Sequence, residues 1–200
     1  GPGLRRLTNH SVHPLVLASA SPRRLGLLQA AGVDPEVRVP SVDETPLPEE
    51  DPVTMVERLA CAKRDAVIAA TPDGPALRVI AADTVVVLDG EALGKPGTPE
   101  VAVAMLSRLS GRTHHVITGV AVAGPAGAVS TTVTTEVTWR PLSVDEIDAY
   151  VATGEPLDKA GGYGIQSGGE DFVTSLVGSR DNVVGLPVAT ALELMATVEM

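Results

Sequence analysis

Two serines and two arginines lie close together at the predicted start of a helix: Ser19, Ser21, Arg23 and Arg24. They follow a short apolar run at 15–18, and the proline after Ser21 is typical of the first position of a helix. A helix N-terminus carries unpaired N–H groups and a partial positive charge, so these side chains could bind phosphate or another anion there. Ordinary helix capping uses the same residues, and this stretch alone leaves both interpretations open.

Asp83 interrupts the strand-like run 77–88, which is otherwise apolar and therefore expected to be buried on both faces. Aspartate disfavours strands, and an unpaired buried carboxylate is costly. We therefore expect a dedicated partner for Asp83, such as a lysine or a metal ion. A structural role, for instance holding a bulge, is the alternative. Because of this local conflict, Asp83 is the best catalytic candidate in the sequence.

Further charged residues occupy positions from which they could reach a common cleft. Glu44, beside Asp43, is a candidate metal ligand, although such acidic pairs usually lie in solvated loops. Lys63 lies at the margin of an apolar helix face and either reaches back to water or points into a polar cleft. Lys95 stands between a glycine and a proline in a stiffened loop, and Lys159 lies in a glycine-rich stretch.

These residue types suit metal-dependent cleavage of a phosphoanhydride. Carboxylate oxygens from Glu44 and Asp83 favour Mg²⁺ or Mn²⁺, ions that also bind substrate phosphates. Cations facing a polyphosphate stabilise the charge of phosphoryl transfer, while a carboxylate deprotonates the attacking water. A covalent route is not supported, since Cys61 lies in a predicted helix without a partner histidine.

The composition limits the possible classes of partner. A net charge of −10 over 200 residues argues against general binding to nucleic acid or to an anionic membrane. No apolar run is long enough for a membrane span, and the single cysteine makes a cytoplasmic location the expectation. We expect residues 1–13 to be a leader or an expression remnant, and residues 14–200 to form a single domain.

The order of elements predicts a mixed α/β fold. Helix starts are indicated by capping residues followed by proline, and in one case by a capping box, at Ser21, Asp51, Thr98 and Ser143. Strands are expected at 15–18, 36–39, 77–88, 114–123, 130–139 and 172–177, with an antiparallel pair around the turn 124–127. Residues 155–169 read as a polar loop and 178–182 as a turn before a closing helix. This pattern favours a mixed twisted sheet with flanking helices and two lobes around a central cleft.

Short motifs along the whole chain resemble the Maf family of nucleoside triphosphate pyrophosphatases. They run in order from Leu15 to the C-terminus, so chance agreement is improbable. The motifs are Ser19-Ala-Ser-Pro-Arg-Arg24, Val42-Asp-Glu44, Leu59-Ala-Cys-Ala-Lys63, Ala81-Ala-Asp-Thr84, Gly94-Lys-Pro96, Thr118-Gly-Val120, the stretch from Gly154 to Gln166, and Asn182-Val-Val-Gly-Leu-Pro187. Arg64 and the segments 167–171 and 178–182 depart from the family pattern.

The resemblance implies a fold like that of inosine triphosphate pyrophosphatases and hydrolysis of a nucleoside triphosphate between its α and β phosphates, with a divalent metal. It implies that Asp83 is the proton acceptor and, with Glu44, a metal ligand. The substrate contacts that it implies are Ser19, Arg23, Arg24, Lys63 and Lys95. The branch acting on dTTP and UTP is similar at Arg23, Thr84 and Gln166, and a homodimer is expected by resemblance only.

Two other classes of function compete with this interpretation. One is a nucleotide-binding regulatory protein, linked to septum formation, that senses a triphosphate without significant turnover. A pure sensor needs the cations but not a base, so the presence of Asp83 favours the enzyme. The other is a kinase-like transferase, and the missing P-loop pattern counts against it.

Overall fold

The computed structural model describes residues 13–72 and 77–199, and within them seven strands form one mixed sheet. Their order is β2-β1-β3-β5-β6-β7, with β4 paired to β3 outside this path. Strands β1 (Leu15–Ala18), β2 (Glu36–Val37) and β3 (Arg78–Leu88) are parallel. The antiparallel part comprises β4 (Glu91–Leu93), β5 (Thr113–Gly124), β6 (Gly127–Trp139) and β7 (Val173–Val177), which pair with β3 or with each other.

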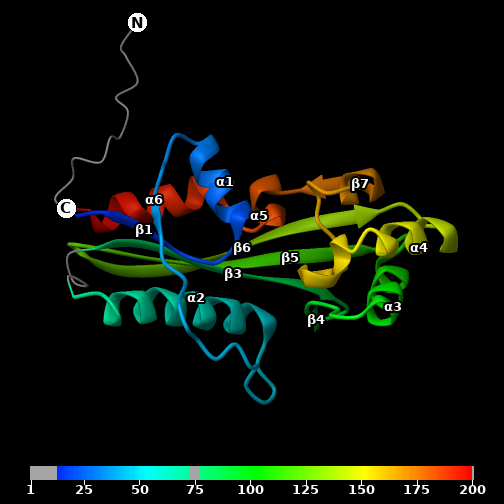
Figure 1. Ribbon diagram of the computed structural model, residues 1–200, viewed down its shortest axis with the longest axis horizontal. Coiled ribbons are helices and arrows are strands. Elements are labelled where there is room, and N and C mark those ends of the chain that lie inside the picture. Colours follow the sequence, from blue (N-terminus) through cyan, green and yellow to red (C-terminus); the bar gives the residue numbers. More distant parts are fainter. Residues whose placement is uncertain (1–12, 73–76, 200) are drawn as a thin grey trace, which may run out of the picture.

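Helices cover both faces of this sheet (Figure 1). Helices α1 (Pro22–Ala30) and α6 (Val188–Val198) lie on one face, and α2 (Pro52–Ala69) lies on the other. Helices α3 (Pro99–Leu109) and α4 (Val144–Ala152) cover the far end of the sheet, and α5 (Arg180–Val184) follows β7. The predicted caps at Ser21, Asp51, Thr98 and Ser143 are confirmed, because each side chain accepts a hydrogen bond from the first turn of its helix.

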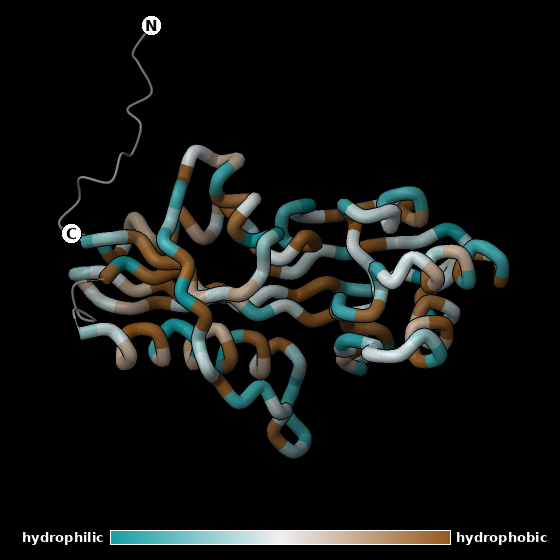
Figure 2. The backbone as a smooth tube through the Cα atoms, in the orientation of Figure 1, coloured by the Kyte–Doolittle hydropathy of each residue, from teal (hydrophilic) through white to brown (hydrophobic). Residues whose placement is uncertain are grey.

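The long strands β3 and β5 pass through two separate hydrophobic cores. In the first core, Ile80 and Val120 pack with residues of α1 and α6. In the second, Val86 and Val116 pack with residues of α3 and α4 and with Trp139. The apolar colouring of the strands in Figure 2 runs through both cores. The predicted mixed sheet with two lobes is confirmed, and the polar residues of β3 lie where the two cores meet.

A close approach of main chains places α2 on this junction. A Cβ atom at Gly119 of β5 would overlap the main-chain carbonyl of Val56 in α2, so glycine lets the helix lie directly on the strand. The same helix carries Lys63 two turns further on. The position of that lysine is therefore fixed by packing between α2 and the sheet.

Residues 155–169 are more ordered than the polar loop expected from the sequence. They contain the 3₁₀ turns η2 (Glu155–Asp158) and η3 (Ala160–Gly162) and lead into η4 (Gly169–Phe172). Positive φ angles at Gly161 and Gly162 allow the tight reversals, while Tyr163 and Phe172 are buried in the second core. The prediction of a loop without a packed core is wrong, because such short turns leave no periodic apolar pattern to detect.

Three smaller expectations also differ from the structure. The predicted turn 178–182 contains the start of α5, which Ser179 caps. The expected strand 36–39 pairs only at Glu36 and Val37, and β4 was not expected at all. Strands this short depend on a neighbouring strand rather than on their own sequence.

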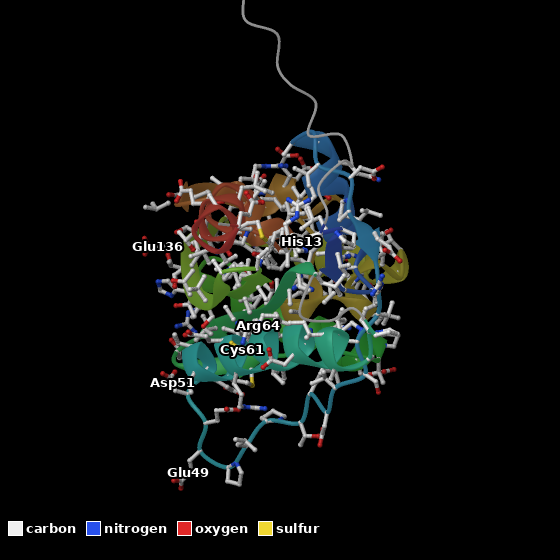
Figure 3. All side chains as sticks on the ribbon, turned by 90° about the vertical axis from the view of Figure 1, so that its left-hand side faces the viewer. His13, Glu49, Asp51, Cys61, Arg64 and Glu136 are labelled. Carbon is white, nitrogen blue, oxygen red and sulfur yellow. The ribbon has the colours of Figure 1, made fainter. Side chains whose placement is uncertain are left out.

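The chain between β2 and α2 protrudes beyond the body of the molecule. In Figure 1 this excursion extends past α2, and Figure 3 shows Glu49 at its outer end, below Asp51 at the start of the helix. The excursion, residues 38–51, carries Glu44. No helix in the described parts of the chain is long and apolar enough to cross a membrane.

Candidate active site

A cavity of about 930 Å³ opens where the two cores meet. Its walls come from the start of α1, the excursion 38–51, α2, the middle of β3, the loop after β4, the segment 155–167 and the end of α5. Every site residue proposed from the sequence lines it: Ser19, Arg23, Arg24, Glu44, Lys63, Asp83, Thr84, Lys95 and Gln166. The fold thus brings these distant positions to one place.

Lys63 joins the two carboxylates of the site. Its Nζ lies 3.0 Å from Oδ1 of Asp83 and 2.8 Å from Oε1 of Glu44, and it also donates to the carbonyl of Ala82 at 3.4 Å. The hydrogen bond from Lys63 lowers the pKa of Glu44. Asp83 therefore has the lysine partner expected from the sequence, and Lys63 points into the cleft rather than back to water.

Arg24 is held by the protein on several sides. Its Nε donates to the carbonyl of Gly185 at 2.7 Å, Nη2 donates to Oγ1 of Thr84 at 3.0 Å, and Nη1 lies 3.5 Å from Oγ of Ser19. Burial lowers the pKa of Arg24, and the nearby Asp83 carboxylate opposes that shift. Because a guanidinium stays charged even after such a shift, the cavity contains a fixed cation next to the carboxylates.

Ser19 and Ser21 of the opening motif have different roles. Ser21 is the N-cap of α1, and its Oγ accepts from the backbone N–H of Arg24 at 3.3 Å. Ser19 is buried and accepts from the backbone N–H of Ser21 at 3.0 Å, while it also lines the cavity. Capping and a cavity-facing arginine therefore coexist in one turn, and the two interpretations left open by the sequence do not exclude each other.

Lys95 and Gln166 line the cavity from its second-core side and are exposed to solvent. Arg23 lies on the opposite wall at the start of α1. Thr84 lines the cavity too, but its hydroxyl is already bonded to Arg24. These four side chains line the cavity that holds the Lys63–Asp83 pair, and they come from four separate segments of the chain.

Lys159 differs from the other cations that the sequence placed at the site. Its Nζ donates to the carbonyl and carboxylate of Glu155 at 2.8 and 2.9 Å, and to Oδ1 of Asp158 at 3.3 Å. Its stem packs on Gly164, where an added Cβ would lie 2.8 Å from Cε. Lys159 therefore ties the segment 155–167 together, with its ammonium committed to the protein.

Some residues that shape the site were given no individual role from the sequence. Gly185 supplies a carbonyl to Arg24, and Thr118 lies behind Thr84. Tyr163 lines the cavity, and its hydroxyl lies 2.6 Å from Nε2 of the buried His114. Thr118, Tyr163 and Gly185 lie within the family motifs, which is the signal that could have singled them out, whereas the buried His114 looks like ordinary core.

The donor set fits a divalent metal that shares its coordination with substrate. Glu44 and Asp83 offer two carboxylates on either side of Lys63. The described residues contain no group of three or more His, Cys, Asp or Glu that could hold a metal by themselves. Mg²⁺ usually binds one or two carboxylates together with water and substrate phosphates, so a two-carboxylate site suits it when a nucleotide is present.

Arg64, which departs from the family pattern, does not line the cavity. Its Nη1 donates to the carbonyl of Val129 on β6 at 3.3 Å, and its Nε pairs with Asp65. Figure 3 shows Arg64 beside Cys61 on α2. The departure affects contacts between α2 and the sheet and leaves the cavity wall unchanged.

Comparison with known proteins shows the family to which the chain belongs. The sequence model of the family described as Maf-like protein matches residues 14–198, and the chain belongs to this Maf family. It is similar to proteins named dTTP/UTP pyrophosphatase. The protein from Moorella thermoacetica is 50% identical over 186 residues, 91% of this chain and 93% of that protein. The one from Desulfotalea psychrophila is 50% identical over 182 residues (90% and 92%), and the one from Shigella dysenteriae is 47% identical over 182 residues (91% of each).

Solved structures give more distant matches. The Ham1 protein of Staphylococcus aureus matches with a TM-score of 0.44 and 17% identity, covering 92% of this chain and 99% of that one. A nucleoside-triphosphatase, dITP/XTP pyrophosphatase, from Mycobacterium abscessus matches with a TM-score of 0.40 and 19% identity, over 63% of this chain and 74% of that one.

Proposed function

We propose that this chain hydrolyses dTTP and UTP to the nucleoside monophosphate and pyrophosphate. The observation that carries the proposal is the cavity in which Lys63 holds Asp83 and Glu44 while Arg24 stands fixed nearby. Relatives of about the same length that are named dTTP/UTP pyrophosphatase support the substrates. The family model matches residues 14–198, which supports a single Maf domain that begins at residue 14.

Asp83 is the proposed proton acceptor. Its Oδ1 is engaged by Lys63, so we assign Oδ2 to the proton of the attacking water. Ser19 and Arg24 are proposed to bind phosphate oxygens, and Lys63 and Lys95 to neutralise charge as the phosphoanhydride breaks. These groups come from four segments that the fold holds rigidly, which orients the triphosphate before reaction.

Base selection is assigned to Arg23, Thr84 and Gln166. The amide of Gln166 both donates and accepts hydrogen bonds, which suits the paired carbonyl and N–H edge of uracil or thymine. Its exposed position on the cavity wall leaves it available to a base. The Thr84 hydroxyl is bonded to Arg24, so we assign to Thr84 an indirect part in selection, through the placement of that guanidinium beside the bound nucleotide.

A divalent metal, Mg²⁺ or Mn²⁺, is the proposed cofactor, with Glu44 and Asp83 as its protein ligands. When bound, such an ion supplies Lewis-acid stabilisation of charge on the phosphate oxygens. Glu44 stays ionised over a wider acid range because the Lys63 hydrogen bond lowers its pKa. It therefore remains a competent ligand at neutral pH.

The proposal is tested by incubating the protein with each common nucleoside triphosphate and Mg²⁺ or Mn²⁺, and by assaying pyrophosphate and orthophosphate separately. We expect pyrophosphate and the monophosphate from dTTP and UTP, with purine triphosphates as internal comparison. Orthophosphate alone, or no product from any nucleotide, would contradict the proposal. Chelation of the metal is expected to abolish product formation.

The regulatory alternative is not favoured, because the similar proteins are named as enzymes. A sensor would bind dTTP or UTP without releasing product, so the same assay would detect neither pyrophosphate nor orthophosphate. A cytoplasmic location and a homodimer complete the proposal, the dimer resting on family resemblance. Light scattering of the purified protein measures the oligomeric state directly.

A further inference from the structure

A chain of hydrogen bonds runs behind the cavity wall, from Arg24 through two threonines to the main chain beside α5. Thr84 and Thr118 are directly opposite each other in β3 and β5, and their Oγ1 atoms are 2.9 Å apart. Thr118 Oγ1 in turn lies 3.4 Å from the carbonyl of Asn182. Thr118 is fully buried and is not among the residues lining the cavity, so a bound ligand reaches Arg24 but not Thr118.

The protons of this chain can be counted. Arg24 Nη2 donates to Thr84, so the Thr84 hydroxyl must send its own proton elsewhere. If Thr84 donates to Thr118, the Thr118 hydroxyl donates to the carbonyl of Asn182. If Thr118 donates to Thr84, the Thr84 hydroxyl donates to the carbonyl of Gly185 at 3.3 Å. In both arrangements Thr84 keeps a lone pair aimed at Arg24.

The same carbonyl of Gly185 accepts from Nε of Arg24 at 2.7 Å. Gly185 ends α5 with a φ of 139°, a conformation that favours glycine, and Asn182 lies within that helix. Thr118 therefore supports the guanidinium from two directions: through Thr84, and through the turn of main chain that presents the Gly185 carbonyl. Without the Thr118 hydroxyl, Thr84 keeps only the longer bond to the Gly185 carbonyl as an outlet for its proton, and the main chain at Asn182 loses the donor that helps to place that carbonyl.

We infer that Thr118 is a positioning residue that orients Arg24 through Thr84 and thereby sets the affinity of the cavity for phosphate. A guanidinium held in place before the ligand arrives loses less freedom on binding. A side chain that no ligand touches thus contributes to affinity. The inference rests on the proposed role of Arg24 in binding phosphate.

The test is the Thr118→Val variant, which keeps the shape of the side chain and removes the hydroxyl. We expect the dissociation constant for inorganic pyrophosphate, measured by calorimetry, to rise about five- to tenfold, as for the loss of one hydrogen bond. The KM for dTTP should rise by a similar factor while kcat stays within about twofold, since Asp83 and Lys63 are untouched. Thr118→Ser, which restores the hydroxyl, should recover both values.

Thr113→Val is the matched control. Thr113 is on the same strand and forms a cross-strand threonine pair with Thr138, with 2.8 Å between the Oγ1 atoms, but it is exposed and away from the cavity. We expect no change in its pyrophosphate affinity. If Thr118→Val does not fold, the pair Thr118→Ser and Thr118→Ala, which differ by one hydroxyl, takes its place.

A double-mutant cycle with Arg24→Lys separates action through the guanidinium from a general effect on folding. If Thr118 acts through Arg24, adding Thr118→Val to Arg24→Lys should weaken pyrophosphate binding by less than about twofold further. Additive losses, unchanged affinity in Thr118→Val, or an equal loss in Thr118→Ser would each overturn the inference. Wild-type protein that binds pyrophosphate yet cleaves no nucleotide would instead overturn the proposed function, while the binding measurements still decide the role of Thr118.

Discussion

At the scale of single residues, Asp83 shows how a costly group is tolerated inside a strand. Its side chain is 15% exposed, and Lys63, at 12%, supplies the opposite charge at 3.0 Å. Truncating one member of such a pair leaves the other charge poorly solvated, whereas a neutral side chain of equal shape disturbs less. Asparagine is therefore the informative replacement for Asp83.

We expect Asp83→Asn to lower kcat by about 100-fold or more, because the variant lacks the proton acceptor. Nucleotide affinity should stay within about tenfold, because Arg24, Lys63 and Lys95 are retained. Single-turnover kinetics and calorimetric titration with dTTP measure the two quantities. A variant that fails to fold, judged by circular dichroism, would show that Asp83 is structural.

His114 is a second residue whose ionisation is coupled to folding. It is fully buried, its Nε2 contacts the Tyr163 hydroxyl, and its Nδ1 has no hydrogen-bond partner among the described residues. Burial lowers the pKa of His114 from 6.5 to about 4. The folded protein thus keeps this imidazole neutral under conditions where the unfolded chain protonates it.

Between pH 6.5 and about 4 the unfolded chain binds a proton at His114 that the native state does not, so the free energy of unfolding falls as the pH drops. The full loss is about 3 kcal/mol. Urea denaturation at several pH values in this range measures the free energy of unfolding. That free energy should fall less steeply with decreasing pH in His114→Gln than in the wild type. His115→Gln, an exposed neighbour on β5, is the control, and identical slopes in all three proteins would contradict the assignment.

At the scale of elements, the excursion 38–51 needs support because it leaves the body of the molecule before it returns to α2 (Figure 3). Arg58 of α2 supplies it with a two-point pair to Glu50, Nε to Oε2 at 2.5 Å and Nη2 to Oε1 at 2.7 Å. Its Nη2 also lies 3.5 Å from the carbonyl of Thr45, next to Glu44. The helix that carries Lys63 thereby also fixes the segment that carries the proposed metal ligand.

Arg58→Lys removes the fork geometry and keeps the charge, so it should loosen Glu44 without altering the cations of the cavity. We expect the Mg²⁺ concentration for half-maximal activity to rise about threefold, with a smaller change in the KM for dTTP. Arg108→Lys breaks a similar surface pair with Glu91 and serves as control. Equal effects of the two variants would contradict a specific role for Arg58.

The sequence predicted the features that depend on neighbouring residues better than those that depend on packing between distant segments. The caps at Ser21 and Ser143 were predictable because a cap and its helix are adjacent in the chain. The η turns and α5 were not, since they depend on packing Tyr163, Phe172 and Val183 into or against a core built by other elements. At the site, residue types and motifs predicted which side chains line the cavity. The bond from Arg24 to Thr84 joins residues 60 positions apart, and no local pattern encodes it.

At the scale of the whole molecule, the two cores share one continuous ladder. Strands β3 and β5 pair without interruption from Val79 opposite Ala123 to Val87 opposite His115. The cavity lies at the middle of this ladder, so its walls belong to both cores. Neither core can unfold without breaking the backbone hydrogen bonds that support the other.

We therefore expect a single cooperative unfolding transition despite the two cores. Trp139, the only tryptophan, is buried in the second core, so its fluorescence reports on that core. Far-ultraviolet circular dichroism instead reports on the helices of both cores and on α2. The two urea transitions should coincide, as two-state unfolding requires. Pyrophosphate should raise both midpoints together, because a ligand bound across the junction stabilises only the state with both walls formed. A fluorescence transition at lower urea than the dichroism transition would mean that the second core opens by itself, and a site assembled from both cores would then be lost before the first core unfolds.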